Sequence, residues 1–441
     1  MSRRSMKLGA FLMAGGHHIA AWRHPDAHAR AGSDIDHFIA LAQIAERGTF
    51  DMIFIEDAAA IRERNPDLAS QAARSTAFEP LSLLAAIAVN TSRIGLVATA
   101  STSYTEPYGL ARSFAALDQL SGGRAGWNLV TSASELEAEN FAASGLRPHS
   151  QRYERAEEFA DTALALWDSV QETAYLPSGE GVFADRSKLH PVHKHGRYFA
   201  VDGILESRRS PQGRPVMVQA GASEAGKDLA ARTADVVFAA SQTKAEAQAY
   251  YADVKSRLAR YGRDPDDLKV MPGISPIVAA TEEEAKAKYR TLQDLIPDAV
   301  GVALLASYLS IQDLAAYPLD GPLPDMPPTN LIQSRQQLIV DLGKREGLSI
   351  RELARHFAGA RGHWQVVGTP GQIADAMEER FLDGAADGFN VMAPLFPSGL
   401  EDFVTLVVPE LRRRGLFRTE YEGKTLRTNL GAAMPTNDEA R

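Results

Sequence analysis

The sequence contains no cysteine, and this absence removes several kinds of chemistry at once. Disulfide bonds, thiolate metal sites, iron–sulfur clusters and cysteine nucleophiles are all excluded. Any catalysis must therefore use histidines, carboxylates, hydroxyls, the backbone or a bound cofactor. A lack of cysteine is typical of a reducing compartment, so we expect a cytoplasmic location.

Long apolar runs and an excess of basic residues are absent as well. No run approaches the roughly 18 apolar residues of a membrane-spanning helix, so we expect no membrane partner. The basic start at Arg3 and Arg4 precedes an apolar stretch that Gly9 and the GGHH sequence at 15–18 interrupt, which argues against a signal peptide. The 47 Lys and Arg residues against 56 Asp and Glu give a net charge of −9, which argues against a nucleic-acid partner.

Several well-known site motifs are also missing. The sequence has no GxxxxGK[ST] phosphate loop, no GxGxxG dinucleotide fingerprint and no GxSxG nucleophile elbow. His17 and His18 are adjacent, so their side chains point in different directions, and no third histidine follows at ligand spacing. We therefore expect no metal site.

What the sequence does contain is an alternation of short apolar runs with helical stretches. Eight runs are bounded by turn residues and apolar on both faces, as strands of a covered parallel sheet are. They lie at 7–13, 50–55, 94–99, 125–131, 215–219, 235–239, 270–279 and 389–393. Helical patterns lie at 34–47, 107–120, 153–167, 224–233, 244–261, 281–295 and 371–382. This alternation predicts an α/β fold, a (β/α)8 TIM barrel, with a doubly wound sheet as the alternative because strand count does not establish closure.

The 441 residues exceed the usual length of one domain, but barrels often do so as a single unit. We expect one barrel domain over residues 1–430, followed by a flexible tail at 431–441. Two stretches interrupt the alternation: 177–199 is rich in glycine, proline, histidine and charge, and 296–330 is rich in proline. Loops of this length usually have a function, so both insertions are candidate lids.

The C-terminal ends of barrel strands carry the chemistry of such folds. His17 and His18 follow the first run, and Asp57 follows the second. After the fifth run, Gly221 and Ser223 belong to a loop of small residues that opens a helix. Backbone N–H groups at a helix N-terminus and a serine hydroxyl form an anion site, although a simple N-cap explains the loop equally well.

A second helix start carries His149 and Tyr153, four residues apart. This spacing places both side chains on one face of the helix near its positive end. Surface capping is the commoner explanation of such a pair, so the residues alone indicate only a barrel enzyme with an anion site.

Motifs along almost the whole chain match a known family in order. They are GGHHIAAWRHP at 15–25, AERGTFD at 45–51, FIED at 54–57, STSYTEPY at 101–108, LDQLSGGRAGWNLVTS at 117–132, RYERAEEF at 152–159, SPQGRP at 210–215, QAGAS at 219–223, DGFN at 387–390, VPELRRRGLFR at 408–418 and YEGKTLR at 421–427. The sequence resembles the bacterial luciferase-like superfamily of flavin-dependent monooxygenases. Within it, the resemblance is to the group of nitrilotriacetate monooxygenase component A and dibenzothiophene sulfone monooxygenase.

The resemblance implies a set of site residues. Flavin contacts fall on Asp57, Ser103, His149, Tyr153 and Ser223, with Gly221 and nearby N–H groups at the FMN phosphate. Asp57 and Ser103 would lie beneath the isoalloxazine ring. Two catalytic assignments also follow, each with barrel packing as the alternative: Asn128 at the polar edge of the ring, and His17 or His18 orienting the peroxide or the substrate.

The resemblance also implies the chemistry. Reduced FMN (FMNH2) would come from a separate NAD(P)H-dependent flavin reductase and react with O2 to form a C4a-(hydro)peroxyflavin that oxygenates a small organic substrate. The family habit is a homodimer or homotetramer. A deazaflavin-dependent oxidoreductase of the same barrel and a non-catalytic flavin-binding relative are the alternatives. Neither the substrate nor the oxygenated atom is indicated.

Overall fold

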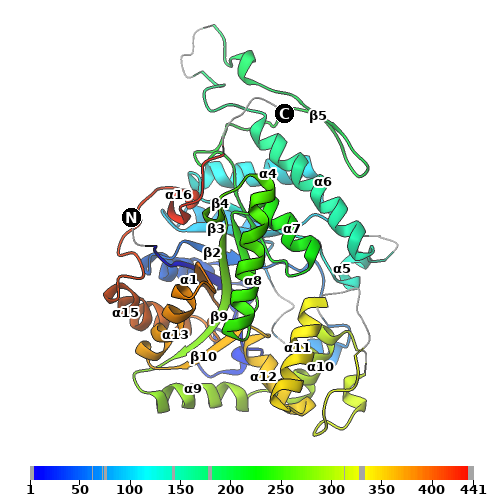
Figure 1. Ribbon diagram of the computed structural model, residues 1–441, viewed down its shortest axis with the longest axis vertical. Coiled ribbons are helices and arrows are strands. Elements are labelled where there is room, and N and C mark those ends of the chain that lie inside the picture. The colour runs from blue at the N-terminus through cyan, green and yellow to red at the C-terminus, as the bar shows by residue number, and fades with distance from the viewer. Residues whose placement is uncertain are drawn as a thin grey trace.

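The fold is built on a closed ring of eight parallel strands. The computed structural model describes residues 4–61, 63–71, 73, 77–141, 145–176, 181–311, 313–326 and 333–435. The strands follow the order β1-β2-β3-β4-β7-β8-β9-β11, and β11 pairs with β1 to close the ring. Figure 1 labels β2, β3, β4 and β9 of this ring. Their bounds are β1 Lys7–Leu12, β2 Met52–Ile55, β3 Gly95–Ser101, β4 Ala125–Val130, β7 Val216–Gln219, β8 Val236–Ala239, β9 Lys269–Val278 and β11 Gly388–Val391.

The predicted (β/α)8 barrel is confirmed, and each of the eight predicted runs overlaps one strand of the ring. The doubly wound alternative is wrong because the β8–β9 and β11–β1 pairings leave the ring no open edge. One further parallel strand, β10 (Trp364–Gly368), was not predicted. It pairs with Ile274–Val278 in the second half of β9, beyond the stretch that pairs with β8.

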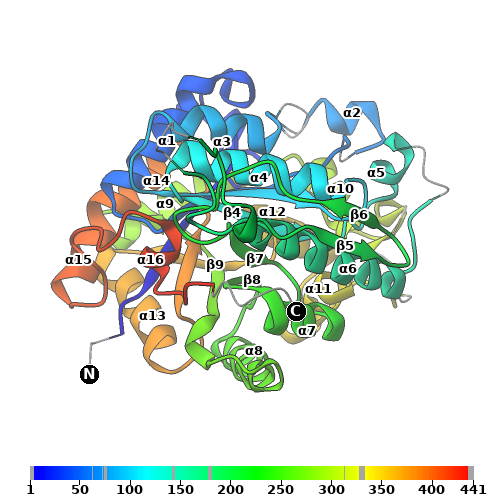
Figure 2. The ribbon, with the colours of Figure 1, turned by 90° about the horizontal axis from the view of Figure 1, so that it is seen from above.

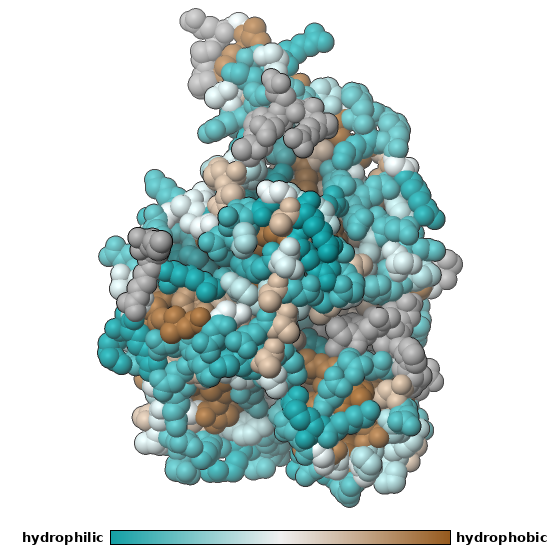
Figure 3. All heavy atoms as spheres, viewed as in Figure 1, coloured by the Kyte–Doolittle hydropathy of each residue, from teal (hydrophilic) through white to brown (hydrophobic). Residues whose placement is uncertain are grey.

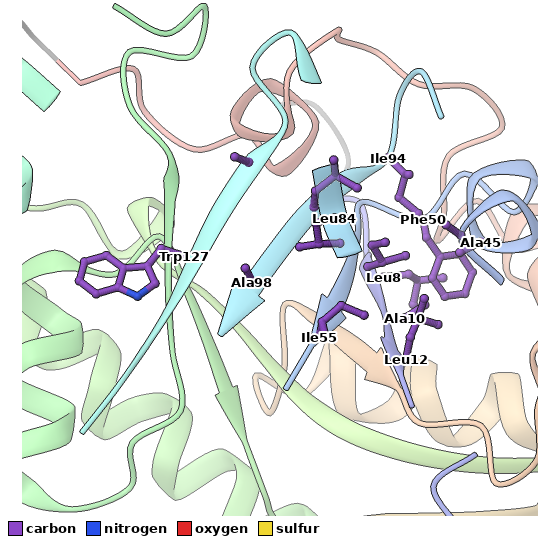
Figure 4. Close-up of a cluster of buried hydrophobic side chains, with 14 of the residues drawn as sticks. Leu8, Ala10, Leu12, Ala45, Phe50, Ile55, Leu84, Ile94, Ala98 and Trp127 are labelled. Carbon is purple, nitrogen blue, oxygen red and sulfur yellow. The ribbon is translucent and has the colours of Figure 1, made fainter. Parts of the chain in front are cut away.

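The strands are apolar on both faces because each face meets a different apolar layer. In β1, Leu8, Ala10 and Leu12 point outward to the helices, whereas Phe11 points into the barrel. Figure 4 shows the outer layer, in which these side chains lie near Phe50. The alternation of inward and outward side chains thus places every second strand residue in the barrel interior.

Helices cover the outside of the ring (Figures 1 and 2). The seven predicted helical stretches all overlap helices of the structure. The helix bounds are α1 Ile35–Arg47, α2 Pro66–Ala69, α3 Pro80–Ala88, α4 Pro107–Ser121, α5 Glu135–Asn140, α6 His149–Asp168, α7 Glu224–Thr233, α8 Lys244–Arg257, α9 Glu282–Asp294, α10 Asp298–Leu309, α11 Gln333–Glu346, α12 Ile350–Ala360, α13 Pro370–Leu382, α14 Ser398–Asp402, α15 Val408–Arg413 and α16 Leu426–Leu430.

The insertion predicted at 296–330 is more ordered than a loop. It contains α10, which packs with α11 and α12 around a separate apolar core that includes Leu305, Leu353 and Phe357. Apolar surface is visible in this region, at the lower right of Figure 3. α10 therefore belongs to a helical unit with α11 and α12, which lie after the insertion in the chain.

The described part of the 177–199 insertion leads into an antiparallel hairpin, β5 (Val192–His195) with β6 (Ala200–Gly203). This region projects from the barrel at the top of Figure 1. Residues 177–180 and 436–441 lie outside the described residues. Residues 431–435 of the predicted tail contact the protein: Arg427 donates to Ala433 O at 3.1 Å and Arg209 donates to Pro435 O at 3.3 Å.

No single helix of the described chain is long and apolar enough to span a membrane; α9 and α10 meet that test only as a pair bent by 87°.

Candidate active site

A cavity of about 680 Å³ occupies the end of the barrel where the strands terminate. Six barrel strands contribute to its wall, and the rest comes from α6, α7, α10 and α11, from the segments after β2, β4, β7 and β8, and from Ile19, Arg361 and His363. The lining residues used below are Phe11, Phe54, Glu56, Asp57, Thr99, Asn128, Thr131, His149, Arg152, Tyr153, Gly221, Ser223, Gly226, Phe238, Val300, Ala303, Leu304, Arg335, Arg361 and His363. The cavity lies where barrel enzymes keep their active sites.

The start of α7 forms one end of the cavity. Ser223 is the N-cap of α7: its Oγ accepts the Gly226 N–H at 3.1 Å and donates to Tyr153 Oη at 3.2 Å. A Cβ on Gly226 would lie 2.9 Å from Tyr153 Oη, and one on Gly221 would lie 3.1 Å from the Gly226 Cα. The two glycines therefore allow a close approach that side chains would prevent. The first-turn N–H groups of a helix such as α7 can bind an anion.

The start of α6 adjoins that site. The rings of His149 and Tyr153 lie 4.8 Å apart, and both residues line the cavity together with Arg152. Burial, and then the positive charge of Arg152, lower the pKa of His149, so the imidazole is neutral at pH 7. The predicted pairing of His149 with Tyr153 on one face is thus present, and Ser223 connects it to α7.

Asn128 provides a polar group in the barrel interior. Its side chain is buried, and its Nδ2 donates to Thr99 Oγ1 at 2.9 Å, while Thr99 Oγ1 donates to Ile55 O at 2.8 Å. Asn128 Oδ1 has no hydrogen-bond partner among the described residues. A buried acceptor left unpaired costs about 1–3 kcal/mol, so a donor from a bound molecule would stabilise it.

Three phenylalanines form an aromatic floor to the cavity. Phe11 lies 4.8 Å from Phe54 and 5.7 Å from Phe238, measured between ring centroids. Phe238 in turn stacks on His363 at 5.0 Å. The three rings are steeply inclined to one another, at 67° for Phe11 and Phe54 and 84° for Phe11 and Phe238, so the floor is apolar but not flat.

Of the two residues predicted to lie beneath the flavin ring, Asp57 lines the cavity and Ser103 does not. Asp57 follows β2, is exposed and lines the cavity. Ser103 is not part of the lining; its Oγ donates to Thr131 O at 2.7 Å, and Thr131 is part of it. Ser103 is therefore connected to the cavity lining through the backbone of Thr131.

His17 and His18 do not reach the cavity wall. His17 Nε2 donates to Phe11 O at 2.7 Å and its Nδ1 accepts a hydrogen bond from Arg361. His18 is buried, its Nδ1 accepts the Ala20 N–H at 3.2 Å, and burial lowers its pKa to about 4. Both histidines thus follow the end of the first strand, and His17 hydrogen-bonds to two cavity residues, Phe11 and Arg361.

Sequence reasoning missed a polar wall opposite these groups. Arg335 on α11, and Arg361 and His363 after α12, line the cavity, and Arg361 Nη1 lies 3.5 Å from Glu56 Oε1. These residues follow the insertion predicted at 296–330, in a segment for which no site residue was predicted. Their order has no motif, so spatial proximity was the only signal that could have found them.

Only one of the two predicted lids contributes residues to the cavity wall. Val300, Ala303 and Leu304 of α10 line it, whereas no described residue of 177–199 does. Of the two candidate lids, the structure therefore supports only the 296–330 insertion.

Comparison with known proteins agrees with this site. The model of the luciferase-like monooxygenase family matches residues 16–387. The chain belongs to this family. N-acetyl-S-(2-succino)cysteine monooxygenase of Bacillus subtilis is 50% identical over 442 residues, which cover 100% of this chain and 99% of that protein. Nitrilotriacetate monooxygenase component A of Aminobacter aminovorans is 47% identical over 449 residues, with 100% and 99% covered.

A solved structure of riboflavin lyase, with a modified FMN and riboflavin, is similar with a TM-score of 0.88 and 30% identity. The similarity covers 98% of this chain and 96% of that one. The family match and the two monooxygenase relatives show that this luciferase-like protein is an oxygenase.

Proposed function

We propose that the protein is an FMN-dependent monooxygenase, the oxygenase component of a two-component system. A separate NAD(P)H-dependent flavin reductase supplies its reduced FMN, and O2 is the second substrate. The observation that carries the proposal is the anion site at the start of α7, built from Ser223, Gly226 and Tyr153 beside the aromatic-floored cavity. An anion site next to an aromatic apolar pocket suits a phosphorylated ring cofactor.

The residues present fit such a flavin. Ser223 and the first N–H groups of α7 would hold the phosphate, with His149 and Tyr153 at its side. Asn128 Oδ1, which has no hydrogen-bond partner among the described residues, would accept from the N–H edge of the ring. When bound, reduced FMN would supply the electrons that activate O2, so that one oxygen atom can be transferred to the substrate.

The chain's own residues bind, orient and exclude water. The phenylalanine floor and the apolar face of α10 exclude water from the reacting atoms. Exclusion of water prevents activated oxygen from being lost without oxygenation of the substrate. His17 lies behind Arg361 and fixes its guanidinium, so we assign it a positioning role. Ser103 is assigned a similar role through Thr131.

The partner and the substrate are inferred from the relatives. The Aminobacter relative is named as component A, which supports a separate reductase component here. N-acetyl-S-(2-succino)cysteine and nitrilotriacetate, after which the two relatives are named, are the first candidate substrates to test. Both are small molecules with more than one carboxylate.

The test compares FMN with riboflavin, which has the same ring but no phosphate. We expect wild-type protein to bind FMN more tightly than riboflavin, and Ser223→Ala to remove most of that preference. The control is Ser349→Ala, which removes the same kind of N-cap from α12 outside the cavity lining. Each variant loses about 1 kcal/mol of stability from its cap, but only the first changes flavin binding.

Turnover is the second part of the test. With either candidate substrate, O2 uptake should yield an oxygenated product only when a flavin reductase and NAD(P)H are present. Equal affinity for FMN and riboflavin in wild-type protein would contradict the assigned phosphate site. Product formation with oxidised FMN alone would contradict the two-component mechanism.

A further inference from the structure

One wall of the cavity carries more positive than negative charge. Arg335 and Arg361 both line it, and the guanidinium of Arg335 donates to the backbone oxygen of Arg361 at 2.9 Å, so the two residues form one cluster. The carboxylate of this cluster is Glu56, 3.5 Å from Arg361 Nη1. The cluster therefore holds two guanidinium groups and one carboxylate, and that carboxylate contacts Arg361.

Arg335 is the side chain left without a counter-ion. No carboxylate among the described residues lies within 4.0 Å of its guanidinium, whose other contact is His363 Nε2 at 3.4 Å. Burial, opposed in part by Tyr308 and reinforced by the neighbouring charge of Arg361, lowers the pKa of Arg335. A guanidinium nevertheless stays protonated at neutral pH, so the wall keeps an unbalanced charge.

His363 adds no compensating charge. Burial and then the charges of Arg335, Arg361 and His17 hold its pKa well below the usual value. Its ring is therefore neutral and can accept from Arg335 through Nε2. The imidazole positions the guanidinium without balancing it.

The backbone at Arg361 supports a functional role for its side chain. Arg361 ends α12 with φ of 50°, a left-handed conformation that favours glycine at helix ends. An arginine there accepts local strain, and such strain clusters at binding sites. The conformation places the guanidinium between Glu56 and His17 at the cavity wall.

The remaining acidic groups around the cavity belong to other segments. Glu63 accepts the Asn65 N–H at 2.9 Å in the segment after β2, and Glu137 of α5 accepts the Ala59 N–H at 3.1 Å. Asp57 and Glu135 also line the cavity. None of these four is within 4.0 Å of Arg335 or Arg361, so they do not neutralise the wall.

From this arrangement we propose that the substrate is an organic carboxylate, and that Arg335 and Arg361 bind its carboxylate group. A planar guanidinium donates two parallel hydrogen bonds to a carboxylate. The negative charge of the substrate would balance the positive charge that Glu56 does not neutralise. The apolar faces of Val300, Ala303 and Leu304 on α10 would cover the rest of a small molecule. This inference rests on the proposed oxygenase site, and it assigns the substrate class to a part of the cavity away from the phosphate site.

The test measures binding by titration calorimetry, with protein that has been saturated with FMN and with protein that has not. The probes are N-acetyl-S-(2-succino)cysteine, nitrilotriacetate and the uncharged trimethyl ester of nitrilotriacetate. The variants are Arg335→Gln, which removes the charge, and Arg335→Lys, which keeps the charge but loses the fork of donors. The control is Arg345→Gln, on the same helix but exposed and paired with Glu246 and Glu346.

We expect at least one polycarboxylate to bind wild-type protein, and its Kd to rise tenfold or more in Arg335→Gln and less in Arg335→Lys. Arg345→Gln should match wild type, the ester should bind all four proteins alike, and the Kd of FMN should stay within twofold. Failure of both polycarboxylates to bind wild type, equal binding in Arg335→Gln, or equal binding of acid and ester would overturn the proposal. An equal loss of FMN binding would do so too, because it would assign the wall to the flavin. If wild type binds a polycarboxylate but not FMN, the carboxylate site stands and the proposed cofactor fails.

Discussion

Asp118 on α4 is a buried carboxyl group whose protonation affects the stability of the fold. It is fully buried, and its Oδ1 accepts from Ala125 N at 2.9 Å and from Gln212 Nε2 at 2.8 Å. Burial raises its pKa from 3.8 to about 6, although these hydrogen bonds oppose the shift. The folded protein therefore retains a proton between about pH 4 and pH 6 that the unfolded chain has released, so this residue destabilises the fold as the pH rises through 6.

We therefore expect Asp118→Asn to raise the free energy of unfolding at pH 7.5 by up to about 3 kcal/mol, and the gain to disappear near pH 4. Urea unfolding of both proteins at the two pH values measures this. Asp341→Asn, which changes an exposed carboxylate on α11, should have little effect at either pH. A variant that is less stable than wild type at pH 7.5 would show instead that the ionised carboxylate stabilises the fold.

Residue by residue, the strand-end rule located the site but not the direction of each side chain. Six of the nine predicted site residues line the cavity: Asp57, Asn128, His149, Tyr153, Gly221 and Ser223. Their roles stay predictions. His17 and His18 follow the first strand as expected, but the chain turns at Gly16, where a Cβ would meet Pro394 O, and His17 hydrogen-bonds back to Phe11 O. A sequence gives the end of the strand and not this turn.

At the scale of elements, the contact between α6 and α7 depends on a glycine. Gly226 is the third residue of α7, and an added Cβ would press on Tyr153 Oη and on Ser223 Oγ, 3.1 Å away. We expect Gly226→Ala to displace Tyr153 and to weaken FMN binding about tenfold, which corresponds to about 1.4 kcal/mol. Fluorescence titration of FMN measures the change.

Gly109 provides a matched control, because it is also the third residue of its helix, α4, and no atom lies within 4 Å of an added Cβ. Gly109→Ala should leave FMN binding unchanged and stabilise the helix by about 0.5–1 kcal/mol. If both variants bind FMN like wild type, the contact between α6 and α7 is not part of the flavin site.

The eight strands of the ring and seven of its helices were predicted, whereas α10 was not, and α12 was missed in spite of its apolar face. Six prolines between 297 and 328 suggested a loop, yet the apolar sequence DAVGVALLASYL forms a helix between the first of them and the rest. Its side chains meet the cavity on one side and the core with α11 and α12 on another, so no polar stripe marks it as amphipathic. The hairpin β5–β6 and the short strand β10 were missed because they are brief and partly exposed.

The molecule as a whole separates function from stability at the two ends of the barrel. Opposite the cavity, three aspartates each precede a strand and accept the backbone N–H of a neighbouring strand at 2.8 Å: Asp51 from Leu8, Asp235 from Met217 and Asp387 from Val270. Each also pairs with a buried cation, which is Arg418, Arg427 or Lys255 respectively.

Several of the motif residues that carry the family resemblance belong to these clusters. Asp51, Asp387, Arg418 and Arg427 lie within the motifs, yet they are at the end away from the cavity. A motif match can therefore establish the barrel and its closure while it leaves the substrate open. The residues that we propose for the substrate, Arg335 and Arg361, belong to none of the motifs.

Arg427 connects the C-terminal segment to the barrel and allows this division to be tested. Its guanidinium contacts Asp235 at 2.8 and 3.0 Å and also donates to Gln212 O and Ala433 O. Burial would raise the pKa of Asp235, but the charge of Arg427 outweighs it and lowers the pKa. Arg427→Met would therefore leave a buried carboxylate without its partner.

We expect Arg427→Met to lower the free energy of unfolding by about 3–5 kcal/mol, while the folded fraction binds FMN with the affinity of wild type. Adding Asp235→Asn removes the stranded charge, so the double variant should recover part of the loss. Chemical unfolding of the wild type, the two single variants and the double variant gives the coupling energy. A double variant whose loss equals the sum of the single losses would mean that the ion pair does not connect the C-terminal segment to the barrel. Weaker FMN binding in the folded fraction would mean that the two ends of the barrel are not independent.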